Sequence, residues 1–207
     1  MAGEKAPIYL ASRSPRRRAL LDQIGVVHEA LTQRITAARG PDVNEDPLPG
    51  ENPRDYVMRV CRAKVESGWE RVMQRKLPPR GVLAADTTVC IGSEIFGTPV
   101  DASEAVAFLA RLSGREHEVL TAIAFKLGER MEAKLSATAV RFRALSPAEI
   151  ARYVASGEPM DKAGGYGIQG RAGAFVAEIR GSYTGVMGLP LCETVELLAR
   201  FGLGPGA

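Results

Sequence analysis

The stretch ASRSPRRRALL at positions 11–21 crowds hydroxyl and guanidinium groups into a turn before a predicted helix. The polar side chains that could meet a ligand there are Ser12, Arg13, Ser14 and Arg16. At the start of a helix, free N–H groups and the positive end of the helix dipole attract anions. Hydroxyl and guanidinium side chains nearby can complete such an anion-binding site. The stretch therefore predicts a phosphate site. A capped, exposed and basic first helical turn is the alternative, because the P-loop and GxGxxG patterns are both missing.

Two charged residues interrupt apolar patterns elsewhere. Asp86 lies inside the apolar run VLAADTTVC, where an unpaired carboxylate would be unstable. It is either a general base or metal ligand at a strand end, or a structural group that bonds to a neighbouring turn. Lys64 continues the apolar stripe of the helix predicted around it. Its ammonium group either reaches the surface or points into the same cleft, where it needs an anion.

The segment DKAGGYGIQG interleaves Asp161, Lys162 and Gln169 with four glycines. Glycines let the backbone approach a ligand closely, although a multi-turn loop without a ligand has the same composition. By contrast, His28 and His117 each stand alone without a partner at metal-ligand spacing, and both are expected to be structural.

Apolar runs and helix breakers predict strands that alternate with helices. The expected strands are 7–11, 27–35, 82–92, 117–127, 131–142 and 174–179, and the expected helices are 15–24, 54–71, 102–112, 147–156 and 190–201. Residues 36–53 hold four prolines and predict a long loop, of a kind that is often functional. One antiparallel pair, 117–127 with 131–142, is expected in the middle of the sheet. The class is therefore α/β with a mixed sheet.

Composition limits the classes of function. A chain of 207 residues, 45% of them hydrophobic, can bury the core of one large domain or two small ones. The net charge of +3 is too small to indicate a nucleic-acid partner. Three widely spaced cysteines without a CxxC pattern favour a reducing compartment and argue against a disulfide framework or a thiolate zinc site. No run approaches the roughly 18 apolar residues of a membrane helix, and no signal sequence is recognisable, so a cytoplasmic protein without a membrane partner is expected.

Taken together, segments from about Tyr9 to Phe201 resemble the Maf family of nucleoside triphosphate pyrophosphatases. The segments, in order, are YLASRSPRRRALL, RAK, AADTTV, FGTPVDASEAVAFLARLSGREHEVLTA, YVASGEPMDKAGGYGIQG and GSYTGVMGLPL. The resemblance implies an inosine-triphosphatase-like fold, in which a twisted mixed sheet and its flanking helices surround a central cleft. It implies one domain over residues 1–207, with or without two lobes about the cleft, and a homodimer.

The resemblance also implies an activity. Family members hydrolyse the bond between the α and β phosphates of a nucleotide, releasing a nucleoside monophosphate and pyrophosphate, with a divalent metal that is normally Mg²⁺ or Mn²⁺. The family's proton acceptor corresponds to Asp86. Its phosphate-contacting and catalytic Glu and Lys correspond to Glu45 and Lys64. Glu45 and Asp86 are the candidate metal ligands.

Three positions divide the family by substrate. Relatives that prefer dTTP and UTP have Arg after SP, Thr after the motif Asp and Gln in YGIQG, as this chain does with Arg16, Thr87 and Gln169. Relatives that take 7-methyl-GTP have Trp at the first of these positions, a residue other than Thr at the second and Glu at the third. The expected substrate is therefore a pyrimidine nucleoside triphosphate: dTTP, UTP or a modified relative. The expected substrate-binding residues are Ser12, Arg13, Ser14, Arg16, Thr87, Lys162 and Gln169.

Two features depart from the family pattern. The Lys that usually precedes the Pro of GKP is replaced here by Thr98. Either the rate is lower, or Arg13 or Lys162 supplies the missing charge. Asp86 and Thr87 are adjacent, so their side chains face opposite ways in a regular strand. For both to touch one nucleotide, the strand would have to end or twist there.

A second class of function fits part of the same sequence. The family name derives from an association with septum formation, so a nucleotide- or nucleic-acid-binding regulator of cell division without turnover is the alternative. The RSPRRR cluster could touch a nucleic-acid backbone. However, a nucleic-acid binder should present a wide basic face, whereas acidic residues are interspersed throughout this chain, so nucleic acid is not the expected partner.

Overall fold

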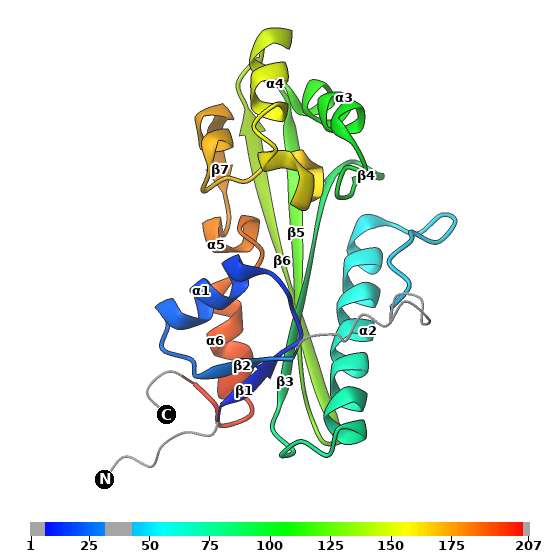
Figure 1. Ribbon diagram of the computed structural model, residues 1–207, viewed down its shortest axis with the longest axis vertical. Helices are drawn as coiled ribbons and strands as arrows, with labels where there is room; N and C mark the ends of the chain where they lie inside the picture. The colour runs from blue at the N-terminus through cyan, green and yellow to red at the C-terminus, as the bar shows by residue number, and fades with distance from the viewer. Residues whose placement is uncertain (1–6, 32–42, 205–207) are drawn as a thin grey trace.

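A mixed sheet runs through the computed structural model, which describes residues 7–31 and 43–204 (Figure 1). The strands are β1 (Ile8–Leu10), β2 (His28–Ala30), β3 (Val82–Ile91), β4 (Glu94–Phe96), β5 (Glu116–Leu127), β6 (Arg130–Phe142) and β7 (Val176–Arg180). The α-helices are α1 (Pro15–Gln23), α2 (Pro53–Gln74), α3 (Ala102–Leu112), α4 (Pro147–Val154), α5 (Tyr183–Val186) and α6 (Leu191–Ala199). Three short 3-10 helices are η1 (Glu158–Asp161), η2 (Ala163–Gly165) and η3 (Arg171–Phe175).

The seven strands follow the order β2-β1-β3-β5-β6-β7, with β4 paired to β3 beside this path. The mixed α/β class is confirmed, but the expectation of one antiparallel pair is wrong. Strand β1 is parallel to β2 and β3, whereas the pairs β3–β4, β3–β5, β5–β6 and β6–β7 are all antiparallel. The three-residue β4 follows β3 after a tight turn and reverses the chain before α3. Its three residues carry no pattern long enough to be recognised in the sequence.

Other differences are local. The strand expected at 27–35 is seen at His28–Ala30, and residues 32–42, which include part of the expected loop, lie outside the described residues. The last strand begins at Val176 rather than at 174, because residues 171–175 form η3. Helix α5 is not among the helices that the sequence predicts.

Polar side chains cap the start of three helices. Asn52 accepts hydrogen bonds from the backbone N–H groups of the first turn of α2, and Asp101 does the same for α3. Ser146 and Glu149 form a capping box at the start of α4. Such caps satisfy N–H groups that a helix leaves without a partner.

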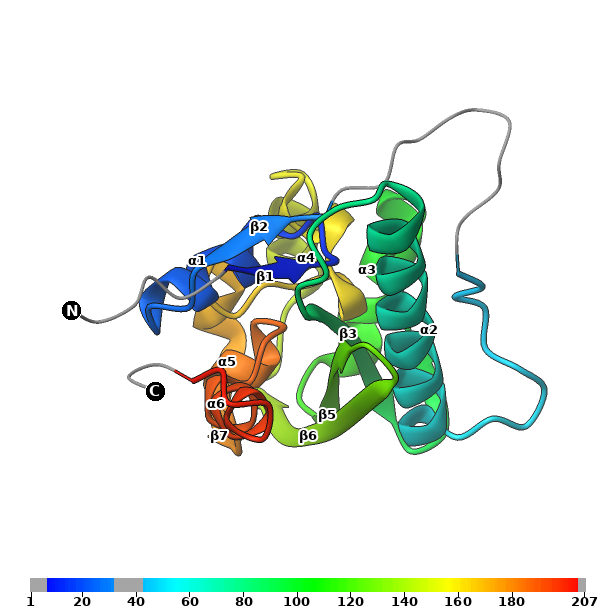
Figure 2. The same cartoon turned by 90° about the horizontal axis from the view of Figure 1, so that it is seen from below.

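Three clusters of buried hydrophobic residues join these elements. One lies between α2 and the face of the sheet that it covers, and a second lies beneath α1 and α6 on the other face (Figure 2). The third contains α3, α4 and the 3-10 helices near one end of the long strands. Helix α2 therefore approaches β3 from one side and α1 from the other.

A gap along one edge of β3 creates the cleft. Strand β1 pairs with β3 only at Val82 and Leu83, and β4 begins to pair at Val89. Between these contacts, residues 84–88 pair with β5 on one edge, while no described strand pairs with the other. Polar groups along that open edge are available to a ligand.

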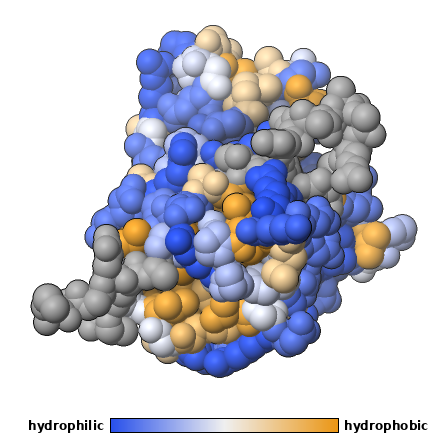
Figure 3. Space-filling model, turned by 60° about the horizontal axis from the view of Figure 1, so that its bottom comes forward, coloured by the Kyte–Doolittle hydropathy of each residue, from blue (hydrophilic) through white to orange (hydrophobic). Residues whose placement is uncertain are grey.

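Within the described residues, none of the helices combines the length and the apolar character needed to cross a membrane. The face shown in Figure 3 is mostly hydrophilic, with hydrophobic residues gathered in its lower half. The large hydrophobic residues that are exposed include Val27, Met73 and Val100, which belong to separate parts of the chain. Such single exposed side chains are normal on a protein surface.

Candidate active site

A cavity of about 950 Å³ opens at the unpaired edge of β3. It is lined by the β1–α1 turn, the middle of β3, one face of α2 and the glycine-rich segment after α4. All the sequence-predicted site residues line it: Ser12, Arg13, Ser14, Arg16, Glu45, Lys64, Asp86, Thr87, Lys162 and Gln169. Thr98, at the position where the family usually has Lys, lines the same cavity.

The start of α1 faces this cavity without a side-chain cap. Ser14 is the N-cap residue, but its hydroxyl caps no backbone N–H, and Pro15 occupies the first helical position. The Ser14 N–H donates instead to Oγ of Ser12, 3.2 Å away. The first N–H groups of a helix have no partner within the helix. This arrangement suits an anion.

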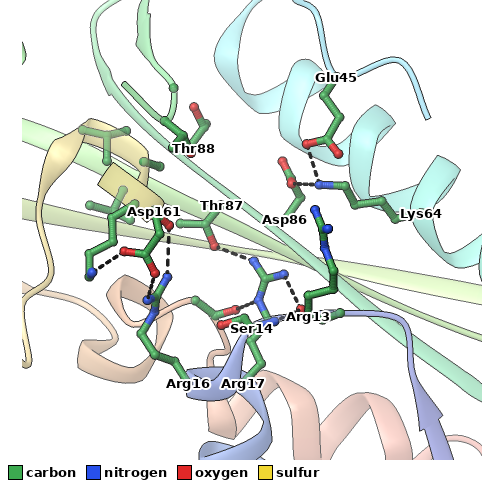
Figure 4. Close-up of a pocket in the computed structure, with 18 of the residues that line it drawn as sticks. Arg13, Ser14, Arg16, Arg17, Glu45, Lys64, Asp86, Thr87, Thr88 and Asp161 are labelled. Carbon is green, nitrogen blue, oxygen red and sulfur yellow. Dashed lines mark hydrogen bonds and ion pairs between the residues drawn. The ribbon is translucent and has the colours of Figure 1, made fainter. Parts of the chain in front are cut away.

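Arg17 is the residue of this turn that the sequence analysis missed. Its Nε donates to the Gly188 carbonyl at 2.8 Å, and its two Nη atoms reach Ser12 Oγ at 3.2 Å and Thr87 Oγ1 at 3.4 Å (Figure 4). Burial lowers the pKa of Arg17, while the charge of Asp86 works in the opposite direction. The guanidinium thus joins α1, β3 and the turn after α5. The run of arginines was the available signal, but which of them turns inward depends on the packing.

Lys64 connects the two carboxylates of the site. Its Nζ lies 2.7 Å from Oδ1 of Asp86 and 2.8 Å from Oε2 of Glu45. Asp86 is only 7% exposed, so the ammonium provides the partner that a buried carboxylate needs. Between the two sequence interpretations of Lys64, the structure selects the one in which it points into the cleft.

Tyr56 holds the loop that carries Glu45. Its hydroxyl donates to the Glu45 carbonyl at 2.9 Å. Burial, followed by the charges of Asp86 and Glu45, raises the pKa of Tyr56 to about 12, so this hydroxyl remains a donor at neutral pH. The backbone at Glu45 is therefore tied to α2, the same helix that carries Lys64.

Asp86 and Thr87 both line the cavity, although β3 does not end at this point. The strand continues to Ile91, and its pairing with β5 runs in continuous register from Val82 to Cys90. Of the two expected alternatives, a strand end is therefore excluded. Asp86 points toward α2 and Thr87 toward α1, and the cavity lies along the open edge between the two faces (Figure 4). A ligand at a strand edge can meet side chains from both faces.

The glycine-rich segment closes the side of the cavity opposite α2. Gly164 has a φ of 68° and a backbone N–H that donates to the Gly97 carbonyl at 2.9 Å. A Cβ on Gly164 would lie 2.8 Å from a methyl carbon of Val89, so the close approach requires glycine. This contact brings the segment that carries Lys162 and Gln169 against the end of β3.

The cations of the site differ in their partners. Arg16 pairs with Asp161 Oδ2 at 2.9 Å, and Lys162 pairs with the same carboxylate. Arg13 is exposed at the cavity and has no hydrogen-bond partner among the residues that the structure describes. Arg13 is therefore available for an anionic ligand.

The two carboxylates suit a hard divalent cation. Among the described residues, no cluster of three or more His, Cys, Asp and Glu side chains could hold a metal by itself. Mg²⁺ does not need such a cluster, because it is bound by one or two carboxylates together with waters and substrate phosphates. Glu45 and Asp86, which share Lys64, match this donor set.

Two comparisons place the chain in a family. A family model described as "Maf-like protein" matches residues 7–201. The dTTP/UTP pyrophosphatase of Aromatoleum aromaticum is 57% identical over 96% of this chain and 97% of that protein. Those of Dechloromonas aromatica and Nitrosomonas europaea are each 54% identical, over 96% and 95% of this chain and 98% and 95% of their own lengths.

Among solved structures, the Staphylococcus aureus Ham1 protein aligns with a TM-score of 0.43 and 13% identity, over 66% of this chain and 72% of that chain. The family assignment rests on the matches in sequence, which span nearly the whole chain. The chain belongs to the Maf family.

Proposed function

We propose that this chain hydrolyses dTTP and UTP, and related modified pyrimidine nucleotides, to the nucleoside monophosphate and pyrophosphate. The observation that carries the proposal is the single cavity in which Lys64, Asp86 and Glu45 face the serine–arginine turn of α1. The relatives named dTTP/UTP pyrophosphatase, which are 51–57% identical over nearly the whole chain, support the same substrates.

The cavity supplies the positive charge that a triphosphate needs. Arg13, Arg17 and Lys64 line it together with the uncapped start of α1. Phosphoryl transfer depends mainly on the position of the reacting groups and on neutralisation of the phosphate charge. Arg17 and Lys64 are fixed before the substrate arrives, since both are already held by protein partners.

Asp86 is the proposed acceptor of the proton from the attacking water. Its carboxylate lies at the open strand edge, and Lys64 fixes one of its oxygens at 2.7 Å. The other oxygen can accept a hydrogen bond from water beside the phosphate. Glu45 and Asp86 would hold the divalent cation, Mg²⁺ or Mn²⁺, which supplies charge neutralisation on the phosphate oxygens.

Base selection is assigned to Arg16, Thr87 and Gln169. A hydroxyl and an amide offer both donors and acceptors, which suits the edge of a pyrimidine ring. A site built to bond one edge leaves its groups unpaired with another base, and this penalty produces discrimination.

A homodimer and a cytoplasmic location are further proposals, which rest on the family resemblance and on composition.

Pyrophosphate release from dTTP, UTP, dCTP, ATP and GTP tests the function. With Mg²⁺ or Mn²⁺ we expect dTTP and UTP to be hydrolysed faster than the purine nucleotides, and a chelator to abolish release. Tight nucleotide binding without turnover of any of the five would refute the enzyme and favour the regulator. Faster turnover of purine nucleotides would refute the assigned substrate class.

A further inference from the structure

An ion pair crosses the cleft at the end of the cavity where base selection is assigned. Arg16 lies in the first turn of α1, and Asp161 ends η1, 145 positions later in the chain. Arg16 Nη1 lies 2.9 Å from Asp161 Oδ2, and its Nη2 lies 3.5 Å from the Asp161 carbonyl (Figure 4). Two contacts from one guanidinium to one residue restrict its rotation.

The same carboxylate holds a second cation. Asp161 Oδ1 accepts a hydrogen bond from Nζ of Lys162, which also donates to the Glu158 carbonyl at 2.8 Å. The pKa of Asp161 is under opposing influences: burial raises it, and hydrogen bonds from Lys162 and Arg16 outweigh burial and lower it. The carboxylate of Asp161 therefore offsets part of the positive charge of Arg16 and Lys162 beside the cavity.

This cluster also touches the loop that carries Gln169. The Lys162 side chain lies across Gly167, where a Cβ would stand 2.7 Å from its Cε atom. The Gln169 Oε1 atom would lie 3.7 Å from the same Cβ position. Asp161 thus joins Arg16 to Lys162, and Lys162 lies beside the loop that carries Gln169.

Stability does not account for this ion pair. The Asp161 side chain is 63% exposed and that of Arg16 is 24% exposed, and ion pairs of this kind contribute little to folding. The pair between Arg16 and Asp161 instead affects the binding of a highly charged ligand. Without Asp161, Arg16 and Lys162 would attract phosphate groups to the end of the cavity that carries Gln169.

We propose that Asp161 is a positioning residue that sets both the base preference and the direction of the bound nucleotide. It fixes Arg16 and Lys162 beside the base and offsets part of their positive charge. The phosphates are then directed to Arg13, Arg17 and Lys64, with Arg13 in place of the charge that Thr98 lacks. This inference rests on the proposed function, because it assumes a pyrimidine triphosphate in the cavity.

The test compares wild type, Asp161→Asn and Asp161→Glu by steady-state kinetics with dTTP and GTP, and by inhibition with inorganic tripolyphosphate. For Asp161→Asn we expect the ratio of kcat/KM for dTTP to that for GTP to fall about tenfold, mainly through KM for dTTP. Tripolyphosphate, which has no base, should inhibit about tenfold more tightly, because two cations lose their acid. Asp161→Glu should recover most of both changes.

Glu178→Gln is the matched control, because Glu178 pairs with Arg141 at 3.1 Å on the exposed β6–β7 surface and does not line the cavity. It should leave the substrate ratio and the tripolyphosphate inhibition unchanged. Values for Asp161→Asn that equal those of this control would overturn the proposal. If wild type hydrolyses no nucleotide, the proposed function fails, while calorimetric binding of tripolyphosphate to wild type and Asp161→Asn still tests the charge effect of Asp161.

Discussion

The Nζ atom of Lys64 lies 2.7 Å from Oδ1 of Asp86, which joins the middle of α2 to the open edge of β3. The contact depends on the docking of α2 over the sheet through Val57, Val60 and Cys61, which are fully buried. The apolar residues that anchor α2 to the sheet thus also direct Lys64 toward the Asp86 carboxylate.

Asp86→Asn retains the size of the side chain and removes its ability to take a proton. We expect pyrophosphate release from dTTP to fall by about 10² or more. The fold should persist, because Lys64 keeps its contact with Glu45 at 2.8 Å. Asp22→Asn, at an exposed position of α1 outside the cavity, is the control. An Asp86→Asn protein as active as this control would refute the role of Asp86.

Thr98→Lys places the usual family charge at the rim of the cavity. We expect KM for dTTP to decrease severalfold relative to wild type at low ionic strength. Added salt should reduce this difference in KM, since salt screens exposed charges. Kinetics at two salt concentrations measure both effects. Ser93→Lys, in the exposed turn between β3 and β4, adds the same charge outside the cavity lining. Equal effects of the two substitutions would show that net charge alone is responsible.

His117 should make the protein less stable in acid. It is 2% exposed, its Nε2 bonds to the Tyr166 hydroxyl at 2.8 Å, and burial lowers the pKa of His117 from 6.5 to about 4. Between these values the unfolded chain binds a proton that the folded chain does not. The contribution of His117 to the free energy of unfolding is therefore complete above pH 6.5, and it is lost as the pH falls toward 4.

The expected loss is on the order of 3 kcal/mol at the acid end of this range. Urea unfolding at pH 7 and pH 4.5 measures it. His117→Gln can still bond to Tyr166 but does not titrate, so its free energy of unfolding should depend less steeply on pH. The same pH dependence in both proteins would be inconsistent with a neutral, buried His117.

Thr88→Val should stabilise the protein. Thr88 is 1% exposed, and its Oγ1 has no hydrogen-bond partner among the described residues. Replacing an unpartnered buried hydroxyl with a methyl group should raise the free energy of unfolding by about 1 kcal/mol. Thr138→Val provides the contrast, because Thr138 Oγ1 accepts a hydrogen bond from the Ser182 N–H at 2.9 Å. Loss of this hydrogen bond should lower the free energy of unfolding. Calorimetric melting that shows the same direction of change for both variants would contradict this reasoning.

Local features of the structure could be predicted from the sequence because they depend on neighbouring residues. The Ser146–Glu149 capping box and the Asp101 cap join groups only three positions apart. The long strands β5 and β6 follow from uninterrupted runs with a short turn between them. The candidate site residues were also identifiable, through the order and spacing of their motifs, and all of them line one cavity.

The direction of the strands could not be predicted, because strand pairing is decided between distant segments. Strand β4 reverses the chain with three residues, and this reversal makes β5 antiparallel to β3. Asp86 and Thr87 share the cavity because β1 and β4 leave a gap along β3, which is a property of three strands together.

The sequence by itself determined where the long helices and strands lie, where several helices begin, and which polar groups are unsuited to a core. Only the tertiary structure decided that Arg17 turns inward, that Lys64 meets Asp86, and that Asp161 reaches Arg16 across 145 positions of the chain. The physical reason is the range of the interactions. Capping and periodicity act over a few residues, whereas these contacts exist only after separate elements have packed against the sheet.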